Sequence, residues 1–301
     1  MAVTQDRPPW HNLAGVSASA EYAQKRAQSM MDLRGRVVLI TGASSGIGRA
    51  TARAFAPTGA RLVLAARRAD RLAALAHELE EVGCETLAVP TDMRREEDIA
   101  ALARAALERF GRIDILVNNA GLGRIHWLEA LTPEEIREQF DVNIVGMVLL
   151  TRAVLPVMQR QRSGHIINIA SVAGRIGTPG YTVYAATKFA VEGFSEALRR
   201  EVAPWGIYVS VVYPGGATGT EFGAKAHLEQ RIMHSPAWLR VSAEDVARVV
   251  VRLARRPRRQ VILPWLLAVG AALNRLAPWL LDWFMVRLVR ARRADDLAAS
   301  R

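Results

Sequence analysis

Short apolar runs recur along the chain between residues 37 and 263, and longer segments with helix-like spacing separate most of them. Nearly every position in these runs is apolar, which is typical of strands buried on both faces of a sheet. The seven runs cover residues 37–40, 62–64, 87–89, 113–117, 166–169, 209–212 and 261–263. The pattern predicts one α/β domain over residues 33–263, a doubly wound parallel sheet with helices on both faces.

The two ends of the chain differ from this domain. Residues 1–32 are rich in Ala, Ser and Gln and lack a sustained apolar stripe, which predicts a loosely ordered N-terminal arm, part helical near residues 20–31. Residues 264–301 are apolar but interrupted by charges, and they predict a C-terminal helical tail.

Composition narrows the class of protein. With 301 residues and 50% apolar positions, the chain can build a sizeable core, which excludes a disordered chain or a small disulfide scaffold. The lone cysteine, Cys84, forms no internal disulfide, and the six histidines lack metal-ligand spacing, so we expect no metal. The N-terminus carries Asp6 and prolines rather than an export signal, so we expect a cytoplasmic protein, peripheral at the inner face of a membrane if the tail binds lipid.

A glycine-rich segment, residues 41–48, follows the first apolar run and opens a helical pattern. Glycines at such a point let the backbone turn tightly and approach a pyrophosphate, which then rests on the helix N-terminus. The spacing is G-x-x-x-G-x-G without a following Gly-Lys-Ser/Thr, so a nucleoside triphosphatase loop is not supported. The predicted cofactor contacts here are Gly42, Ser44, Ser45, Gly46, Ile47 and Gly48.

The end of the second run bears on the choice of cofactor. This run ends with Ala66, and Arg67 follows it. A site for NAD(H) places a carboxylate here to bind the ribose 2′-hydroxyl, whereas a site for NADP(H) places guanidinium donors that bind the 2′-phosphate. We therefore favour NADP(H) over NAD(H), with Arg67 as the main contact and Arg49 as a second one. The alternative is that these are solvated arginines of an Arg-rich protein.

Four residues could carry chemistry. Tyr184 and Lys188 are spaced i,i+4, so a helix would point both side chains the same way. A phenol has a pKa near 10, and a neighbouring ammonium together with a cationic nicotinamide would favour the phenolate. Ser171 follows a predicted strand, where a hydroxyl can hydrogen-bond a carbonyl oxygen. Asn143 interrupts an apolar helix, so its amide needs bound water or backbone as a partner.

These four residues, with residues 41–48, residues 118–121 and the pair Pro214 and Gly215, occur in the order and spacing of the short-chain dehydrogenase/reductase family. The resemblance implies an oxidoreductase whose single domain is a Rossmann-type doubly wound parallel sheet. The resemblance covers about residues 33–263. It implies that Tyr184 is the general acid/base and that Lys188 lowers its pKa and holds the nicotinamide ribose. It further implies that Ser171 polarises the substrate oxygen and that Asn143 anchors a water linking Lys188 to a proton relay.

The resemblance also implies further cofactor contacts and an assembly. Asp92 matches an acid that contacts adenine, and Asn119, Ala120 and Gly121 match a strand end beside the adenosine. Pro214 and Gly215 precede a threonine near the carboxamide, for which Thr218 and Thr220 are both candidates. The family's oligomers imply a homodimer or homotetramer, formed through helices around residues 144–160 and 183–200.

The segment from Gly216 to Leu239 corresponds to the family's variable substrate lid. Its side chains include Phe222, Met233 and Trp238, which suggest an apolar substrate, although core packing or exposure would explain them as well.

The C-terminal tail allows several interpretations. Residues 261–274 are uncharged, but a bilayer span needs about 20 apolar residues, and Arg275 soon follows. Residues 240–301 hold thirteen of the arginines against five acids, and Trp265, Trp279 and Trp283 lie among them. This favours peripheral membrane contact through residues 264–293, with packing on a partner subunit or over the site as an equal alternative and a span or hairpin less favoured. The apolar residues between the arginines argue against nucleic acid.

The residues together predict hydride transfer between NADP(H) and a carbonyl or alcohol of a small, hydrophobic substrate. The alternative is a nucleotide-binding scaffold or redox sensor with a membrane- or partner-associated tail. A scaffold has no need for Ser171, Tyr184 and Lys188 together, which favours the enzyme.

Overall fold

The computed structural model describes residues 31–222, 226 and 236–299, with side chains up to residue 292. The predicted N-terminal arm and Met233 therefore lie outside the described residues, except for Met31 and Asp32 at the end of the arm.

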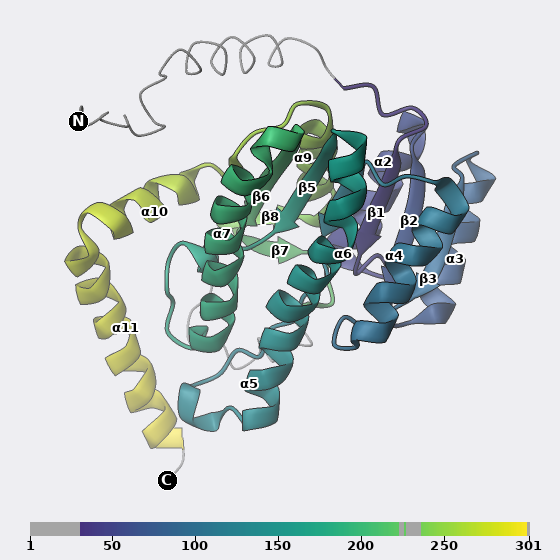
Figure 1. The fold of residues 1–301 in the computed structure, drawn as a ribbon. Coiled ribbons are helices and arrows are strands. Elements are labelled where there is room, and N and C mark those ends of the chain that lie inside the picture. Colours follow the sequence, from purple (N-terminus) through teal and green to yellow (C-terminus); the bar gives the residue numbers. More distant parts are fainter. Residues whose placement is uncertain (1–30, 223–225, 227–235, 300–301) are drawn as a thin grey trace, which may run out of the picture.

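Seven parallel strands form one sheet in the order β3-β2-β1-β4-β5-β6-β9 (Figure 1). Their bounds are β1 Val37–Thr41, β2 Arg61–Ala66, β3 Thr86–Pro90, β4 Ile115–Asn118, β5 Gly164–Ile169, β6 Ile207–Pro214 and β9 Gln260–Leu263. Each of the seven predicted runs overlaps one strand, which confirms the doubly wound α/β fold. The fourth strand begins later than predicted, at Ile115; the preceding Asp114 accepts from the Val37 amide at 3.0 Å through its carboxylate and pairs with Arg36 and Arg112.

Helices cover both faces of the sheet. The helices are α2 Gly46–Phe55, α3 Ala69–Glu81, α4 Glu96–Phe110, α5 Pro133–Phe140, α6 Gly146–Gln161, α7 Thr182–Val202, α9 Ala243–Arg255, α10 Leu266–Leu276 and α11 Pro278–Ala299. Side chains of α2, α3 and α9 share one apolar cluster with the sheet, and those of α4, α6 and α7 share a second cluster on the opposite face.

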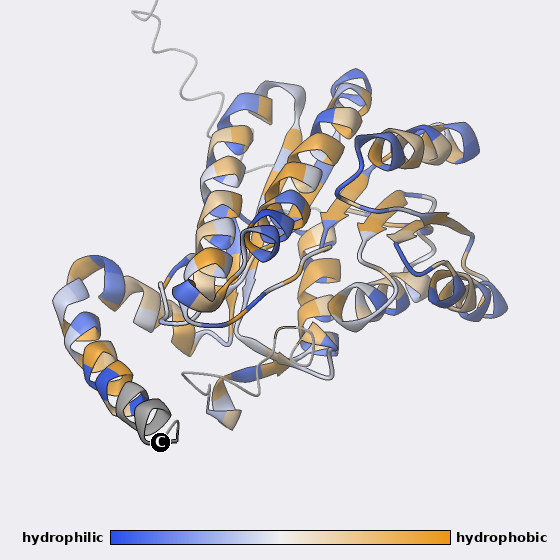
Figure 2. Ribbon diagram, turned by 90° about the horizontal axis from the view of Figure 1, so that it is seen from below, coloured by the Kyte–Doolittle hydropathy of each residue, from blue (hydrophilic) through white to orange (hydrophobic). Residues whose placement is uncertain are grey.

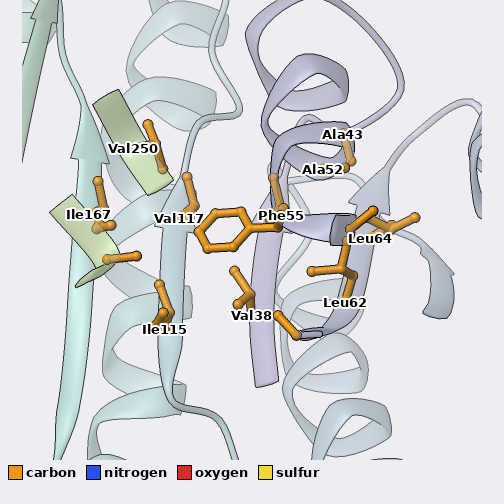
Figure 3. Packing of buried hydrophobic residues seen from close by; sticks show 14 of the residues in the cluster. Val38, Ala43, Ala52, Phe55, Leu62, Leu64, Ile115, Val117, Ile167 and Val250 are labelled. Carbon is orange, nitrogen blue, oxygen red and sulfur yellow. The ribbon is translucent and has the colours of Figure 1, made fainter. Parts of the chain in front are cut away.

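Strand β1 shows why the apolar runs are continuous. Val38 and Ile40 belong to the cluster under α2 and α9, whereas Val37 and Leu39 belong to the cluster under α4 and α6. Figure 3 shows the first cluster, in which the fully buried ring of Phe55 from α2 packs among Val38, Val117 and Leu64. Because successive side chains point to opposite faces, a strand buried on both faces must be apolar throughout.

The order of the strands places the candidate site. The chain moves outward from β1 in one direction through β2 and β3, and then crosses back to β4 on the other side of β1. In open sheets of this kind, ligands bind outside the carboxyl ends of the strands at this switch point. Residues 41–48 follow β1 and residues 119–121 follow β4, so both predicted cofactor segments lie there.

Two features lie outside the main sheet. A small second sheet joins β7 (Gly216–Thr218) to β8 (Arg240–Ser242) and so brackets the predicted lid segment. The tail forms α10 and α11, an arm that extends from the end of β9 and is drawn in yellow tones in Figure 1.

Among the described residues, one helix is long and apolar enough to cross a membrane, judged by length and composition only. It is the continuous helix Pro133–Gln161, formed by α5, α6 and the turn between them. Leu150, Val154 and Met158 of this helix are fully buried against the sheet, so its apolar side serves the core.

Candidate active site

The glycine-rich segment forms a cradle at the N-terminus of α2. Gly42 and Gly46 have φ of +67° and +51°, a backbone conformation that residues other than glycine rarely adopt. A Cβ at Gly48 would lie 2.2 Å from the Gly42 carbonyl oxygen, so α2 can approach the end of β1 only with glycine at this position. The first turn of α2 carries no acidic residue, which leaves its amide groups suited to an anion.

Asn119 fastens the cradle to the end of β4. Its Nδ2 donates to the Thr41 carbonyl at 2.8 Å, and the Thr41 hydroxyl accepts from the amides of Asn119 and Ala120 at 3.0 Å each. Gly121 follows, and a Cβ there would lie 3.2 Å from Asn143 and 3.5 Å from the Lys188 ammonium. This segment therefore connects the cradle to the candidate catalytic side chains.

Arg68 reaches the cradle, and the sequence analysis did not select it. Its Nη2 donates to Ser45 Oγ at 2.9 Å and Ser44 Oγ at 3.3 Å, and its Nη1 pairs with Glu221 at 2.8 Å. Arg67, the predicted contact, is exposed beside it, and Arg49 is exposed on α2. The signal for Arg68 was its adjacency to Arg67 after β2, but only the structure shows which of the two lies over the serines.

Asp92, the predicted adenine contact, lies beyond the end of β3. Its carboxylate accepts from Arg94 Nε at 3.0 Å, and its main-chain amide donates to Asp98 at 2.9 Å. The hydrogen bonds from Arg94 hold the pKa of Asp92 below its usual value, and the charge of Arg67 acts in the same direction. Asp92 is thus ionised and close to the guanidinium predicted to hold the cofactor.

The structure brings Ser171, Tyr184 and Lys188 together. Ser171 follows β5, and its hydroxyl lies close enough to the Tyr184 phenol to act on the pKa of that phenol, in the direction that lowers it. Tyr184 and Lys188 lie one turn apart on α7, and the Lys188 ammonium lies 5.7 Å from the centre of the Tyr184 ring. Lys188 Nζ donates to the Ile169 carbonyl at 3.1 Å, which holds it at the end of β5.

Burial is the main cause of the shifted pKa values of Tyr184 and Lys188. It raises the pKa of Tyr184, against the opposing effect of Ser171, and it lowers the pKa of Lys188 to about 8. For Tyr184 the largest cause is desolvation, which acts in the protein without cofactor. The lowered pKa predicted for Tyr184 depended on the ammonium together with a bound cationic nicotinamide, and it stays a prediction for the cofactor-bound protein.

Asn143 occupies the π-helical turn Asp141–Val145 that joins α5 to α6. Its Oδ1 accepts from the Leu122 amide at 2.8 Å, while its Nδ2 donates to the Leu122 carbonyl at 2.8 Å and to the Thr187 hydroxyl at 3.0 Å. Of the two partners considered from the sequence, the backbone is the one observed. Asn143 therefore fixes the chain after Gly121 next to α7, and a water could use only its remaining oxygen lone pair.

A ladder of hydrogen bonds between buried polar side chains connects the strands that carry the site to two helices. Asn118 and Asn168, paired in register on β4 and β5, are joined by a hydrogen bond of 2.8 Å from Nδ2 to Oδ1. Asn168 donates onward to Ser195 of α7 at 2.8 Å, and Asn118 donates to Thr151 of α6 at 3.1 Å. The sequence analysis assigned these residues no role. They link the strand ends that precede Asn119 and Ile169 to the helices on one face.

The segment after β6 lies between the sheet and the lid. The Gly215 amide donates to the Leu263 carbonyl at 2.6 Å, directly after Pro214. The Thr218 hydroxyl donates to the Val241 carbonyl at 3.3 Å, whereas the methyl group of Thr220 would lie 3.2 Å from a Cβ at Gly46. Of the two candidate threonines, Thr220 is therefore the one that contacts the glycine cradle.

The lid covers the candidate catalytic tyrosine. The ring of Phe222 lies 5.4 Å from that of Tyr184, centre to centre, and Tyr181 packs edge-on at 6.4 Å from the other direction. Gly123 leaves the room that Phe222 occupies, since a Cβ there would lie 2.7 Å from the ring. Trp238, by contrast, is 67% exposed. Of the two described lid aromatics, only Phe222 borders the reacting groups.

Comparison with known proteins identifies the family. The sequence pattern described as short chain dehydrogenase matches residues 36–231. The chain belongs to the short-chain dehydrogenase family. A 3-oxoacyl-[acyl-carrier-protein] reductase of Synechocystis sp. is 37% identical over 229 residues, which are 76% of this chain and 92% of that protein.

Two solved structures extend the comparison. A short-chain dehydrogenase/reductase of Burkholderia phymatum in complex with NAD has a TM-score of 0.75 at 29% identity, covering 83% of this chain and 96% of its own. An alcohol dehydrogenase from the archaeon Thermococcus sibiricus, complexed with 5-hydroxy-NADP, has a TM-score of 0.68 at 32% identity and covers 76% and 95%. Both neighbours hold a nicotinamide dinucleotide, which supports such a cofactor for this short-chain dehydrogenase.

The residues present fit that cofactor. The glycine cradle and the acid-free start of α2 suit a pyrophosphate, and Asn119 keeps the cradle in place. The reacting groups Ser171, Tyr184 and Lys188 lie at the ends of β5 and α7, on the same edge of the sheet. A dehydrogenase or reductase of this family needs both parts, and the fold delivers them to one edge.

Proposed function

We propose that this short-chain dehydrogenase transfers hydride between NADP(H) and a carbonyl or alcohol group of a small, apolar substrate. One observation carries the proposal: Ser171, Tyr184 and Lys188 lie together at the sheet edge that also carries the glycine cradle. A protein that only bound a nucleotide would need the cradle but not this hydroxyl, phenol and ammonium.

Each side chain has a distinct part in the reaction. The bound cofactor supplies or accepts the hydride. Tyr184 donates its proton to the carbonyl oxygen during reduction, and burial, which raises its pKa, keeps the phenol protonated for that step. Ser171 donates a hydrogen bond to the same oxygen, and Lys188 holds the cofactor ribose. In oxidation Tyr184 accepts the proton, helped by the positive charge of the oxidised ring.

The preference for NADP(H) rests on the guanidinium groups after β2. Arg68 lies on Ser44 and Ser45, Arg67 is exposed beside it, and no carboxylate ends the strand where a 2′-hydroxyl would need one. We expect Arg67→Ala and Arg68→Ala each to weaken NADPH binding about tenfold more than NADH binding, as measured by fluorescence titration. Equal losses for both dinucleotides would contradict the assignment; Arg104→Ala on α4 is the matched control.

We infer an apolar substrate from the aromatic ring that packs on the Tyr184 phenol. Phe222 packs on Tyr184, so a substrate that reaches the phenol must move this ring or pack against it. An aromatic wall favours apolar substrates. A homodimer or homotetramer is also part of the proposal, since Val145 and Phe189 are 46% and 43% exposed on the helices expected to pair.

The proposal is tested by turnover. Purified protein is given NADPH and a panel of aliphatic, aromatic and polycyclic carbonyl compounds, and NADPH oxidation is followed by absorbance. We expect Tyr184→Phe to lower kcat by about 10³-fold while NADPH binding is retained, because the proton donor alone is lost. Tyr208→Phe, at the start of β6 and away from the site, is the control.

The scaffold alternative predicts a different result. Under it, the protein binds NADPH but oxidises it with no member of the panel, and Tyr184→Phe changes nothing measurable.

A further inference from the structure

The arm formed by α10 and α11 exposes a large set of apolar side chains. Trp265, Trp279 and Trp283 are 70%, 64% and 59% exposed. The other large apolar residues exposed on the arm are Leu266, Val269, Leu273, Leu276, Leu280, Phe284, Val286 and Leu288. Soluble surfaces rarely carry a contiguous apolar area of this kind, so the arm is built to be covered.

The body of the protein does not cover it. Figure 1 shows α11 turning away from α10 and running apart from α5 and α7. Along the described side chains of α11, Leu281, Met285, Val289 and Arg292 are partly shielded, at the i,i+4 and i,i+3 spacings of a single face. The other side chains between Trp279 and Leu288 are exposed, and all of them except Asp282 and Arg287 are apolar.

Positive charge lies among these apolar residues. Arg275, Arg287 and Arg290 are exposed, against Asp282 as the single acid of the described arm side chains. The Arg287 guanidinium stacks 3.9 Å over the ring of Trp283. Figure 2 shows the same alternation, with hydrophilic and hydrophobic segments following one another along α11. Long cationic side chains next to tryptophan are typical of residues at the boundary between headgroups and acyl chains.

We propose that the arm docks on the surface of a lipid bilayer that carries anionic headgroups. The apolar side chains enter the boundary of the acyl chains, and the arginines meet the phosphate groups. The arm does not span: α10 has 11 residues, and α11 reaches Arg290 after twelve residues, roughly 18 Å of helix against a hydrocarbon core of about 30 Å. A second copy of the chain fits less well, because it would bring the same excess of positive charge, whereas anionic headgroups complement the exposed Arg275, Arg287 and Arg290.

The base of the arm lies beside the active site. Asn274 of α10 donates to the Arg175 carbonyl at 3.2 Å, four residues after Ser171. A side chain at Gly215 would collide with Leu267 of α10, and Gly270 packs near Ile176. Docking would therefore hold the substrate side of the site near the bilayer, where an apolar carbonyl compound is dissolved. This consequence rests on the proposed function, whereas the docking itself does not.

Flotation of the full-length protein tests the docking without any substrate. The protein is mixed with vesicles of phosphatidylcholine alone or with about 30% phosphatidylglycerol, and its distribution in a density gradient is measured. We expect it to float with the anionic vesicles, to remain at the bottom with the neutral ones, and to be released as salt is raised, because headgroup attraction is screened.

Two variants assign the binding to the arm. Trp279→Ser combined with Trp283→Ser should lower the partition coefficient at least tenfold, since both rings leave the acyl boundary. Arg290→Glu should lower it at least fivefold on anionic vesicles. The matched controls are Val82→Ser, at an exposed apolar residue directly after α3, and Arg104→Glu, at an exposed arginine on α4, and both should float like the wild type.

Each other outcome overturns the proposal. Absence of flotation with anionic vesicles contradicts docking, and equal flotation of the arm variants assigns it to another surface. If the tryptophan variant instead changes the sedimentation coefficient in lipid-free buffer, with no flotation by the wild type, the arm covers a second copy. Circular dichroism of each variant confirms that the fold is retained, and retained NADPH turnover shows that a failure of docking is not a failure of the enzyme.

Discussion

The α/β body and the C-terminal arm use similar apolar side chains in opposite ways. Val38, Ile40 and Leu62 in the body are fully buried, whereas Leu276, Trp279 and Leu280 in the arm are 51 to 78% exposed. The difference lies in what surrounds each segment. These body residues lie on β1 and β2, which have a neighbouring strand on both sides and helices on both faces, while α11 turns away from α10 and runs apart from α5 and α7 (Figure 1). Apolar content alone therefore does not predict burial; the topology that supplies partners does.

Polar groups show the same division. In the body, the buried amide of Asn118 donates to Asn168, and the amide of Asn168 donates to the Ser195 hydroxyl. In the arm, Arg287 and Arg290 reach outward from an apolar helix. Buried polar groups need fixed partners, which makes the body rigid around its site. The arm has its polar groups where an aqueous or headgroup layer can meet them.

The largest expected contrast is between two phenylalanines. Phe55→Ala in the body should lower the free energy of unfolding by about 3 to 5 kcal/mol, because it removes a fully buried ring from the cluster of Figure 3. Phe284→Ala in the arm, where the ring is 50% exposed, should change it by less than about 0.5 kcal/mol. Urea denaturation measures both. Similar losses would mean that the arm packs on the body in solution.

The next contrast uses two glycines. Gly48→Ala places a methyl group 2.2 Å from the Gly42 carbonyl, so it should cost about 2 to 3 kcal/mol and weaken NADPH binding at least tenfold. Gly193→Ala on α7 meets no atom within 4 Å and should leave both properties unchanged or raise stability slightly. Calorimetry with and without NADPH reads both effects. Undiminished binding by the first variant would contradict the cradle.

The pH dependence of stability sharpens the description of the site. Burial lowers the pKa of Lys188 to about 8 from 10.5, so between these values the unfolded chain binds more protons than the folded protein. The cofactor-free wild type should therefore gain stability relative to Lys188→Met as pH rises from about 8 to about 10, by on the order of 2 kcal/mol. Parallel urea titrations of the two proteins remove the contribution of other groups. A constant difference across this range would show that Lys188 is not desolvated.

The smallest contrast concerns helix caps. The Ser242 hydroxyl accepts from the Asp245 amide at 3.0 Å at the start of α9, so Ser242→Ala should cost about 1 kcal/mol. Trp265 precedes α10 without a side-chain cap, and Trp265→Ala should leave the midpoint of unfolding in place. A loss for the arm variant as large as that for Ser242→Ala would place α10 inside the cooperative unit.

The sequence predicted what local patterns determine. The apolar runs gave the strands, the glycines near Gly46 gave the cradle, and the Tyr184 and Lys188 spacing gave one face of α7. The sequence did not predict contacts between distant segments. Arg68 donates to Glu221, 153 residues away in the chain, and Asn143 accepts from the backbone amide of Leu122. Such pairs depend on how strand ends and lid come together, which periodicity does not encode. The raised pKa of Tyr184 in the cofactor-free protein depends on burial, which the spacing of Tyr184 and Lys188 does not encode.

The same limit applies to the tail. Arg275 interrupts the run of apolar residues, which indicated that the segment is too short to span a bilayer. Its exposure on an arm, and the packing of Leu267 and Asn274 against the rim of the site, required the three-dimensional arrangement. Whether the arm meets lipid stays a prediction until flotation is measured.

The central claim is that the body catalyses the reaction and the arm brings it to the bilayer. Its most direct test measures two turnover rates with NADPH: one for a water-soluble aldehyde and one for a polycyclic ketone held in anionic vesicles. The wild type is compared with the protein carrying Trp279→Ser and Trp283→Ser. The account predicts that the variant keeps its rate on the soluble aldehyde and loses at least tenfold on the vesicle-held ketone. Equal rates for the variant and the wild type on both substrates, or equal losses on both, would contradict it.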